Sequence, residues 1–362
     1  MKIFHCDHCH HCVYFENVQC VNCRHALGYL LDLHVIGSLD SVGNRLWSSP
    51  LPRAAGKSYR MCQNYSQENV CNWMVPADDP NHYCLSCRLT HVIPDLSKPG
   101  NREAWYELEA AKRRLLYGLI SLGLTVTDRT EAPDTGLLFK FLADFNGSVP
   151  SVLTGHDNGV ITINIAEADH AEREKRRVQM HEPYRTVLGH FRHEIGHYYW
   201  DRLIKDSDRI EPFRELFGAE RDDYAKALER HYQKGAPPDW QENFVSIYAT
   251  THPWEDWAET WAHFLHISDT LETAMACGLS LLPNRSDEPA LRFDTASNAS
   301  PPVSFDHMIQ RWFPLTFVLN NLNRGMGLQD GYPFVLSKRA IQKLRFVYDA
   351  ITSQNTSMQA CA

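Results

Sequence analysis

His193-Glu194-Ile195-Gly196-His197 is the segment that decides how this chain is interpreted. It is an H-E-x-x-H motif in a stretch that the sequence predicts to be helical. Two histidines at positions i and i+4 lie about one turn apart on the same helix face, so both rings can reach one metal ion. Glu194 lies beside them, where its carboxylate can deprotonate a water molecule at the metal. Because the motif is short, its surroundings have to support this interpretation.

The residues around the motif predict a long helix over 184–203. Pro183 is expected in its first turn, where the missing N–H group costs nothing. Apolar residues then recur at spacings of three to four positions and give the helix one apolar face. They are Val187, Leu188, Phe191 and Ile195.

A third ligand is expected from a second helix, because a catalytic zinc keeps three protein ligands and one open position. The segment that Pro253 opens, predicted helical to about Met275, carries Glu255 and Glu259 at positions i and i+4. One of these carboxylates can bind the metal while the other accepts a hydrogen bond from Nδ1–H of a liganding histidine. The alternative is a solvated acidic face, but the tryptophans around the two acids favour burial.

At this point the chain resembles a known family, the zinc-binding metallopeptidases of bacteria whose N-terminal part is a zinc ribbon. The resemblance rests on residues 192–203, 252–259, 71–73 and 84–89. It implies an α+β fold, in which a small cysteine-rich module precedes a zincin-like metallopeptidase domain. The reaction it implies is zinc-dependent hydrolysis of a peptide or isopeptide bond, with a protein or peptide as the partner. It says little about which substrate is cleaved.

The arrangement of the two helices is also similar to that of the gluzincin metallopeptidases. By that analogy Glu255 is the third ligand and Glu259 orients a liganding histidine, and Asp201 of the first helix is expected to support the ligands as well. A narrower similarity, to the catalytic domain of anthrax lethal factor, includes a tyrosine seven residues before the first of these glutamates. Here that residue is Tyr248, which becomes a candidate for stabilising the oxyanion, with a core aromatic residue as the alternative.

Nine of the eleven cysteines lie in the first 87 residues, and this clustering favours zinc over disulfides. Two C-x-x-C turns suit one closed tetrahedral site with four cysteine ligands. They supply Cys6, Cys9, Cys20 and Cys23. A second structural site is predicted from Cys62, Cys71, Cys84 and Cys87, with one true site plus buried thiols as the alternative. Cys12 and the neighbouring histidines could compete as ligands, whereas Cys277 and Cys361 stand apart. The chain is therefore expected to bind two structural zinc ions and one catalytic zinc ion.

The sequence predicts two domains, the cysteine-rich module over residues 1–98 and the metallopeptidase domain over residues 99–362. A long amphipathic helix is expected from Asn101, with Glu109, Lys112, Arg113 and Arg114 on its solvated face. Further helices are predicted over 211–217, 221–233, 312–322 and 338–351. A strand is predicted over 137–142, and Asn158-Gly159 predicts a hairpin between 152–154 and 160–164. Residues 160–165 are proposed as an edge strand that substrate could extend. A surface loop is predicted over residues 283–302. The polar residues at the end of the helix predicted over 312–322 could either bind substrate or cap a turn. They are Asn320, Asn321, Asn323 and Arg324.

Composition excludes several other classes of protein. No apolar run is long enough to span a membrane, and the first residues lack the apolar stretch of a secretory signal, so the chain is expected to be cytoplasmic. The net charge is −8, and residues 1–100 carry eight Lys and Arg against eight Asp and Glu. This balance argues against nucleic-acid binding. The remaining alternative is a zinc-ribbon module that binds a protein partner beside an inactive zincin-like domain. The oligomeric state is not predicted.

Overall fold

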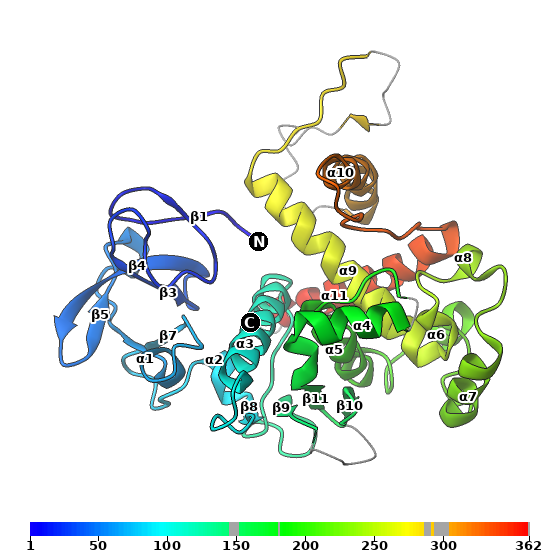
Figure 1. The fold of residues 1–362 in the computed structure, drawn as a ribbon, viewed down its shortest axis with the longest axis horizontal. Helices are drawn as coiled ribbons and strands as arrows, with labels where there is room; N and C mark the ends of the chain where they lie inside the picture. Colours follow the sequence, from blue (N-terminus) through cyan, green and yellow to red (C-terminus); the bar gives the residue numbers. More distant parts are fainter. Residues whose placement is uncertain (145–151, 180–181, 286–290, 293–303, 361–362) are drawn as a thin grey trace. The chain divides into compact units, whose positions relative to one another are not determined.

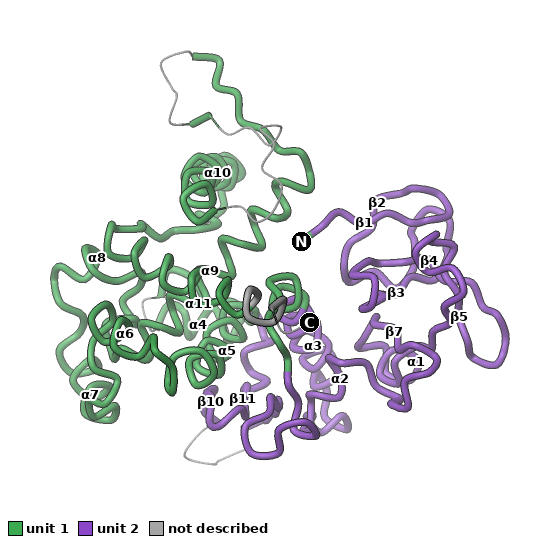
Figure 2. Tube along the Cα trace, turned by 180° about the vertical axis from the view of Figure 1, so that it is seen from behind, with its two compact units in different colours: residues 1, 117–126, 171–362 green, residues 2–116, 127–170 purple. Residues whose placement is uncertain are grey.

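The structure is a computed structural model, which describes residues 1–144, 152–179, 182–285, 291–292 and 304–360. Figure 1 shows its helices and strands, and the described chain forms two compact units (Figure 2). Unit 1 contains residue 1, residues 117–126 and residues 171–362, and unit 2 contains residues 2–116 and 127–170. The division runs through one long helix, so both units use part of it. The domain boundary predicted at residue 98 stays a prediction.

Unit 2 contains all the described strands, in three sheets. They are β1 (Phe4–His5), β2 (Cys12–Val13), β3 (Ala26–Leu30), β4 (Val35–Gly43), β5 (Leu46–Ser48), β6 (Tyr59–Met61), β7 (Met74–Pro76), β8 (Thr90–Val92), β9 (Leu138–Leu142), β10 (Gly155–Asp157) and β11 (Val160–Asn164). Strands β3 to β7 form an antiparallel sheet in chain order, and β1 pairs with β2. The short helices of unit 2 are η1 (Pro52–Ala54), α1 (Gln63–Ser66), α2 (Leu85–Arg88) and η2 (Ile165–Ala168).

The remaining strands form a mixed sheet in the order β10-β11-β9-β8. The strand predicted over 137–142 is confirmed as β9, and the predicted hairpin is present as β10 and β11. Its turn residues Asn158 and Gly159 have φ of 45° and 82°, as a type I′ turn requires. Two details of the prediction were wrong. The first hairpin strand is Gly155–Asp157 and not 152–154, and β11 is an interior strand because it pairs with both β10 and β9, so substrate cannot extend it as an edge.

Helix α3 (Asn101–Ser121) begins where the sequence predicted, but the expected solvation of its charged residues was wrong. Glu109 and Lys112 are fully buried and form an ion pair of 2.8 Å, and Arg113 is 1% exposed. Lys112 also donates to the Thr90 hydroxyl, and Arg113 donates to the backbone oxygen of Val70 at 2.6 Å. A charged residue is buried when partners satisfy it, and an amphipathic pattern does not reveal those partners. Only Arg114, which pairs with Glu16, is substantially exposed.

Unit 1 is helical. Its helices are α4 (His170–Gln179, whose first residue belongs to unit 2), α5 (Val187–Leu203), α6 (Ile210–Phe217), α7 (Tyr224–Lys234), α8 (Trp240–Asn243), η3 (Tyr248–Thr250), α9 (Pro253–Ala276), α10 (Phe305–Gly325) and α11 (Lys338–Ala360). The helices predicted from residues 211, 221, 312 and 338 therefore exist, with shifted ends. The loop predicted over 283–302 lies mostly outside the described residues. Among the described helices, none has the length and apolar composition needed to cross a membrane.

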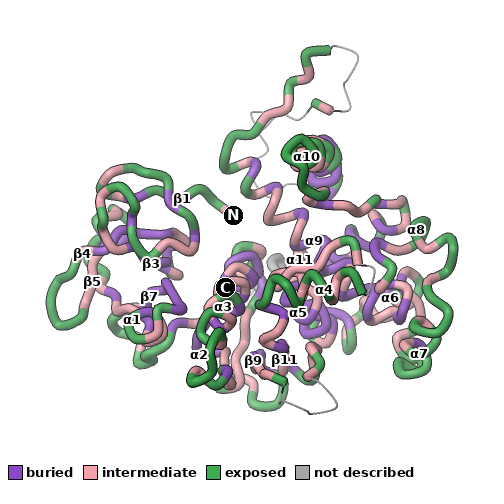
Figure 3. The backbone as a smooth tube through the Cα atoms, in the orientation of Figure 1, coloured by how far each residue is buried: buried purple, intermediate pink, exposed green. Residues whose placement is uncertain are grey.

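Helices α5 and α9 form the centre of unit 1, and both are largely buried (Figure 3). They approach closely at Gly196, where an added Cβ atom would lie 3.0 Å from Ala258 Cα. Trp257, which is fully buried, donates from its indole N–H to the Gly196 carbonyl at 2.8 Å. The small residue inside the H-E-x-x-H motif therefore allows the second helix to pack directly against the first. Helix α9 has Pro253 in its first turn, as predicted.

Local hydrogen bonds in unit 1 correct one prediction and bear on another that had two alternatives. Helix α5 begins after Thr186, whose hydroxyl accepts from Gly189 N, so Pro183 lies before the helix and not in its first turn. The polar side chains at the end of α10 form hydrogen bonds and an ion pair within the turn that follows the helix. Asn320 exchanges two hydrogen bonds with the Tyr332 backbone, and Arg324 pairs with Asp330 at 2.7 Å. These side chains hold the following loop in place.

Candidate metal centre and cysteine clusters

Helix α5 presents His193 and His197 one turn apart. Their ring centroids are 5.0 Å apart, and both side chains are largely shielded from solvent. Helix α9 brings Glu255 to them from its first turn. Glu255 Oε2 lies 2.9 Å from His193 Nε2 and 3.5 Å from His197 Nε2. One atom from each of the three residues therefore converges on a common point, as a shared metal ion requires.

Glu259 lies behind His193, one turn after Glu255 on α9. Its Oε1 is 2.7 Å from His193 Nδ1, and its Oε2 accepts from the Ser246 hydroxyl at 2.6 Å. A protonated His193 donates from Nδ1 to Glu259 and from Nε2 to Glu255, whose Oε2 lies 2.9 Å away. A metal ion bound between Nε2 and Glu255 would replace the Nε2 proton, while Nδ1–H continues to donate to Glu259. The three residues therefore fit a zinc ion, whose bonds to nitrogen and oxygen are about 2.0–2.2 Å.

The charges of the cluster are strongly coupled. Burial disfavours the charged form of His193, but its hydrogen bonds to Glu255 and Glu259 outweigh this and raise its pKa well above the usual value. Burial also disfavours the charged form of Glu255, and the charges of His197 and His193 nevertheless hold its pKa well below the usual value. Glu255 therefore keeps a negative charge in an almost fully buried position, which is the property that a metal-binding carboxylate needs.

Glu194 lies on the same helix between the two histidines and is 7% exposed. Burial raises its pKa, the charges of His193 and His197 oppose this rise, and those of Glu255 and Glu259 add to it. The carboxylate thus lies within the electrostatic field of all three candidate ligands. Its predicted role in moving protons beside a metal ion stays a prediction.

Two tyrosines border the cluster, and the sequence pointed to only one of them. Tyr248 stacks at a tilt near His193, with ring centroids 5.7 Å apart, and shares a hydrogen bond with Tyr224. Tyr224 donates to Glu255 Oε1 at 2.8 Å, so it restrains the carboxylate oxygen that does not face the histidines. Tyr224 is 31 positions from Glu255 and belongs to no motif, so spacing could not have identified it. Ser246 was missed for the same reason.

Asp201 lies one turn after His197 on α5. The contact found for it is an ion pair with Lys205 at 3.5 Å. Burial raises its pKa, while Lys205 and His197 act in the opposite direction. Its predicted role in supporting the ligands stays a prediction.

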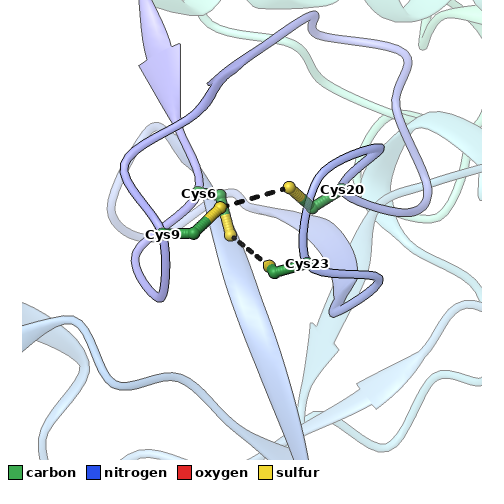
Figure 4. Close-up of side chains that lie close together, drawn as sticks. All are labelled: Cys6, Cys9, Cys20 and Cys23. Carbon is green, nitrogen blue, oxygen red and sulfur yellow. Dashed lines mark hydrogen bonds between the residues drawn. The ribbon is translucent and has the colours of Figure 1, made fainter.

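The cysteines of unit 2 gather in the two predicted groups. Cys6, Cys9, Cys20 and Cys23 form one group, in which Cys6 Sγ lies 3.4 Å from Cys23 Sγ and Cys9 Sγ lies 3.6 Å from Cys20 Sγ (Figure 4). Cys62, Cys71, Cys84 and Cys87 form the other, which is entirely buried, with 3.7 Å between the sulfurs of Cys71 and Cys84. A zinc ion with four sulfur ligands at about 2.3 Å separates them by about 3.8 Å. Both groups fit such an ion.

The remaining cysteines take no part in these groups. Cys12 and Cys277 are exposed, and Cys361 lies outside the described residues. The wide spacing between Cys62 and Cys71 is accommodated by α1, which begins directly after Cys62 and occupies the intervening turn. This explains how a pair that lacks the C-x-x-C spacing still contributes to one cluster.

Comparison with known proteins identifies the family. Residues 101–350 match the family model described as "Putative zinc-binding metallo-peptidase". The chain belongs to this metallopeptidase family. Residues 3–98 match a zinc-ribbon domain, so the resemblance and the α+β fold predicted from the sequence are both confirmed.

Relatives in this metallopeptidase family include proteins of Mycobacterium bovis and Mycobacterium tuberculosis, each described as an uncharacterized protein. Each is 43% identical to this chain over 352 residues, which cover 97% of this chain and 95% of the relative. No solved structure matches the chain. The family description implies zinc binding and peptidase chemistry, and the relatives add no substrate.

Proposed function

We propose that this protein is a zinc-dependent peptidase that hydrolyses a peptide or isopeptide bond. The observation that carries the proposal is the convergence of His193, His197 and Glu255, with Glu194 beside them and Glu259 behind. We further propose that the two cysteine groups hold structural zinc ions, because their four sulfur ligands would leave no position open for substrate.

His193 Nε2, His197 Nε2 and one oxygen of Glu255 would hold the catalytic zinc. When bound, zinc polarises the scissile carbonyl group and makes water a stronger nucleophile at neutral pH. Glu194 takes a proton from the attacking water and passes it to the leaving nitrogen as the C–N bond breaks. The products are a carboxylate and an amine. Glu259 keeps the proton of His193 on Nδ1, and Tyr224 holds the second oxygen of Glu255.

Tyr248 is proposed to donate its O–H group to the oxyanion that develops on the carbonyl oxygen. Its ring lies next to His193, and its hydroxyl is hydrogen bonded to Tyr224. Substrate would have to exchange that hydrogen bond for one to its own oxygen. A preorganised donor of this kind typically contributes about 2.7–4 kcal/mol to transition-state stabilisation.

The proposal is tested with Glu194→Gln, which keeps the size of the side chain and removes its basicity. Wild type and variant are incubated with a mixture of peptides from a digested proteome, and new termini are identified by mass spectrometry. We expect the variant to retain all its zinc and its fold while cleavage falls at least about a hundredfold. The matched control is Glu229→Gln, an exposed glutamate on α7 that should leave cleavage unchanged. Equal cleavage by wild type and Glu194→Gln would overturn the assignment.

Zinc content gives a second readout that does not depend on finding a substrate. After dialysis that removes loosely held metal, wild-type protein should contain about three zinc ions per chain and His193→Ala/His197→Ala about two. If the count does not change in the double variant, the catalytic zinc is absent. The protein would then be better explained as a zinc-ribbon module that binds a partner beside an inactive zincin-like domain.

A further inference from the structure

Two histidines and an aspartate gather on the surface of unit 2, beside the cluster formed by Cys6, Cys9, Cys20 and Cys23. His8, His25 and Asp40 each offer one ligand atom, and these atoms lie within 4.8 Å of one another. His8 Nε2 is 3.2 Å from Asp40 Oδ1, and His25 Nε2 is 4.0 Å from the same oxygen. The two imidazole rings are stacked, with centroids 3.5 Å apart and an angle of 12° between their planes. Both rings thus direct the same nitrogen toward one carboxylate.

Strand pairing explains why His25 and Asp40 meet. Strand β3 begins at Ala26, which pairs with Leu39 of β4. His25 directly precedes Ala26, and Asp40 directly follows Leu39, so the antiparallel register places the two residues opposite each other. Their proximity is therefore fixed by the backbone of the sheet.

His8 is brought to the same place by the first cysteine turn. Its neighbour Asp7 exchanges two hydrogen bonds with Ser38, in which Asp7 N donates to Ser38 Oγ at 2.8 Å and Ser38 N donates to Asp7 Oδ2 at 2.7 Å. Ser38 and Asp40 are two positions apart on β4 and face the same side of the strand. The pairing that fastens this turn to β4 thus also holds His8 over Asp40.

His25 has a further contact that fits this arrangement. Its Nδ1 lies 3.2 Å from Cys23 Sγ, so Nδ1–H can donate to the sulfur. With its proton on Nδ1, the ring has a free lone pair on Nε2, the nitrogen that faces Asp40. A hydrogen bond to the structural cysteine therefore prepares His25 as a ligand. The outer partner of a metal-binding histidine commonly has this role.

We propose that His8, His25 and Asp40 form an additional, exchangeable binding site for a divalent transition-metal ion. Two imidazoles and a carboxylate suit Zn²⁺, Ni²⁺ or Cu²⁺, and they are poor ligands for Ca²⁺ or Mg²⁺. The side chains are about one quarter to one half exposed, so the ion can enter from solvent and keeps at least one position for water or an external ligand. This separates the site from the two closed cysteine clusters and from the proposed catalytic centre, on which it does not depend.

The test uses the full zinc-loaded chain with Ni²⁺ as the probe, measured by calorimetry and by metal analysis after equilibrium dialysis. Because His25 also contacts Cys23, the test variants are His8→Ala and Asp40→Asn, which leave that hydrogen bond in place. We expect wild type to bind one additional Ni²⁺ reversibly, and each variant to bind it roughly tenfold or more weakly. Each variant should retain as much zinc as wild type, which would show that the cysteine clusters are intact.

The matched control is His5→Ala/His11→Ala, which removes two exposed histidines from the same segment but outside the site. It should change Ni²⁺ affinity by less than about twofold, since neither residue is a ligand. His10 is unsuitable as a control because its φ of 57° would strain an alanine. The proposal is overturned if wild type binds no additional Ni²⁺. It is also overturned if His8→Ala and Asp40→Asn bind Ni²⁺ as wild type does, or if the control variant is the one that loses binding.

Discussion

Replacing Glu259 with alanine tests the proposed catalytic site most directly. Glu259 does not face the common point of the three candidate ligands, but it accepts hydrogen bonds from His193 Nδ1 at 2.7 Å and Ser246 Oγ at 2.6 Å. Without it, His193 is free to rotate, and it can also place its proton on Nε2, where zinc has to bind. We therefore expect Glu259→Ala to weaken zinc binding at this site while its ligands remain in place.

Two independent ranges give the expected loss of zinc affinity in Glu259→Ala. Loss of a group that supports a metal-binding histidine typically costs about 10–100-fold in metal affinity, which is about 1.4–2.7 kcal/mol. A hydrogen bond to a charged group contributes about 1.5–3 kcal/mol, and the bond from His193 is of this kind. The two ranges agree, so zinc affinity at this site should fall between about tenfold and a hundredfold.

The assay is competition for zinc against a chelating dye of known affinity, with the protein folded throughout. The cysteine clusters serve as an internal control, because they belong to unit 2 and should retain their zinc in every variant. Glu259→Gln keeps a carbonyl oxygen that can accept from Nδ1–H and should lose less than about tenfold. A folded Glu259→Ala protein whose affinity lies within about threefold of wild type would refute the idea that Glu259 orients His193.

Three further variants probe contacts that spacing could not reveal. Tyr224→Phe frees one oxygen of Glu255 and should weaken zinc binding by roughly three- to tenfold, as measured in the same competition assay. Lys343→Met leaves the buried Asp256 carboxylate without its partner and should lower the free energy of unfolding by about 3–5 kcal/mol in urea titrations. Adding Asp256→Asn should recover more than half of that loss, and no recovery would mean that packing and not charge is responsible. Arg113→Met should make the second cysteine cluster release zinc faster to a chelator, with the first cluster unchanged.

The parts of the site that lie within one helix were predictable because helix geometry converts spacing into position. His193 with His197, and Glu255 with Glu259, are each separated by four residues, and the structure places each pair on one face. Packing of α5 on α9 then brings the two pairs together. Gly196 makes this close packing possible, because a side chain there would collide with Ala258. A reader of the sequence sees the glycine but cannot know which helix it faces.

Other features could not be predicted because they depend on contacts between distant residues. Tyr224 reaches Glu255 from α7, and Ser246 reaches Glu259 from the segment before η3. The start of α5 was misplaced because Pro183 and Thr186 are both good initiators, and only the observed hydrogen bond to Gly189 selects Thr186. The interior position of β11 was missed because strand order depends on pairing with β9, which precedes the hairpin in the chain.

The burial of Arg113 was the least predictable feature, and it bears on the second cysteine cluster. A buried guanidinium group is costly unless an anion compensates its charge. Burial lowers the pKa of Arg113, but the charges of Cys71, Glu109, Cys87 and Cys84 outweigh this and raise it. Glu109 is also paired with Lys112, so negative charge on the cysteines would add to the compensation. Neutral thiols would leave the charge of Arg113 uncompensated, whereas four thiolates around a zinc ion carry a net negative charge. The zinc ion proposed at this cluster would therefore account for the burial of Arg113.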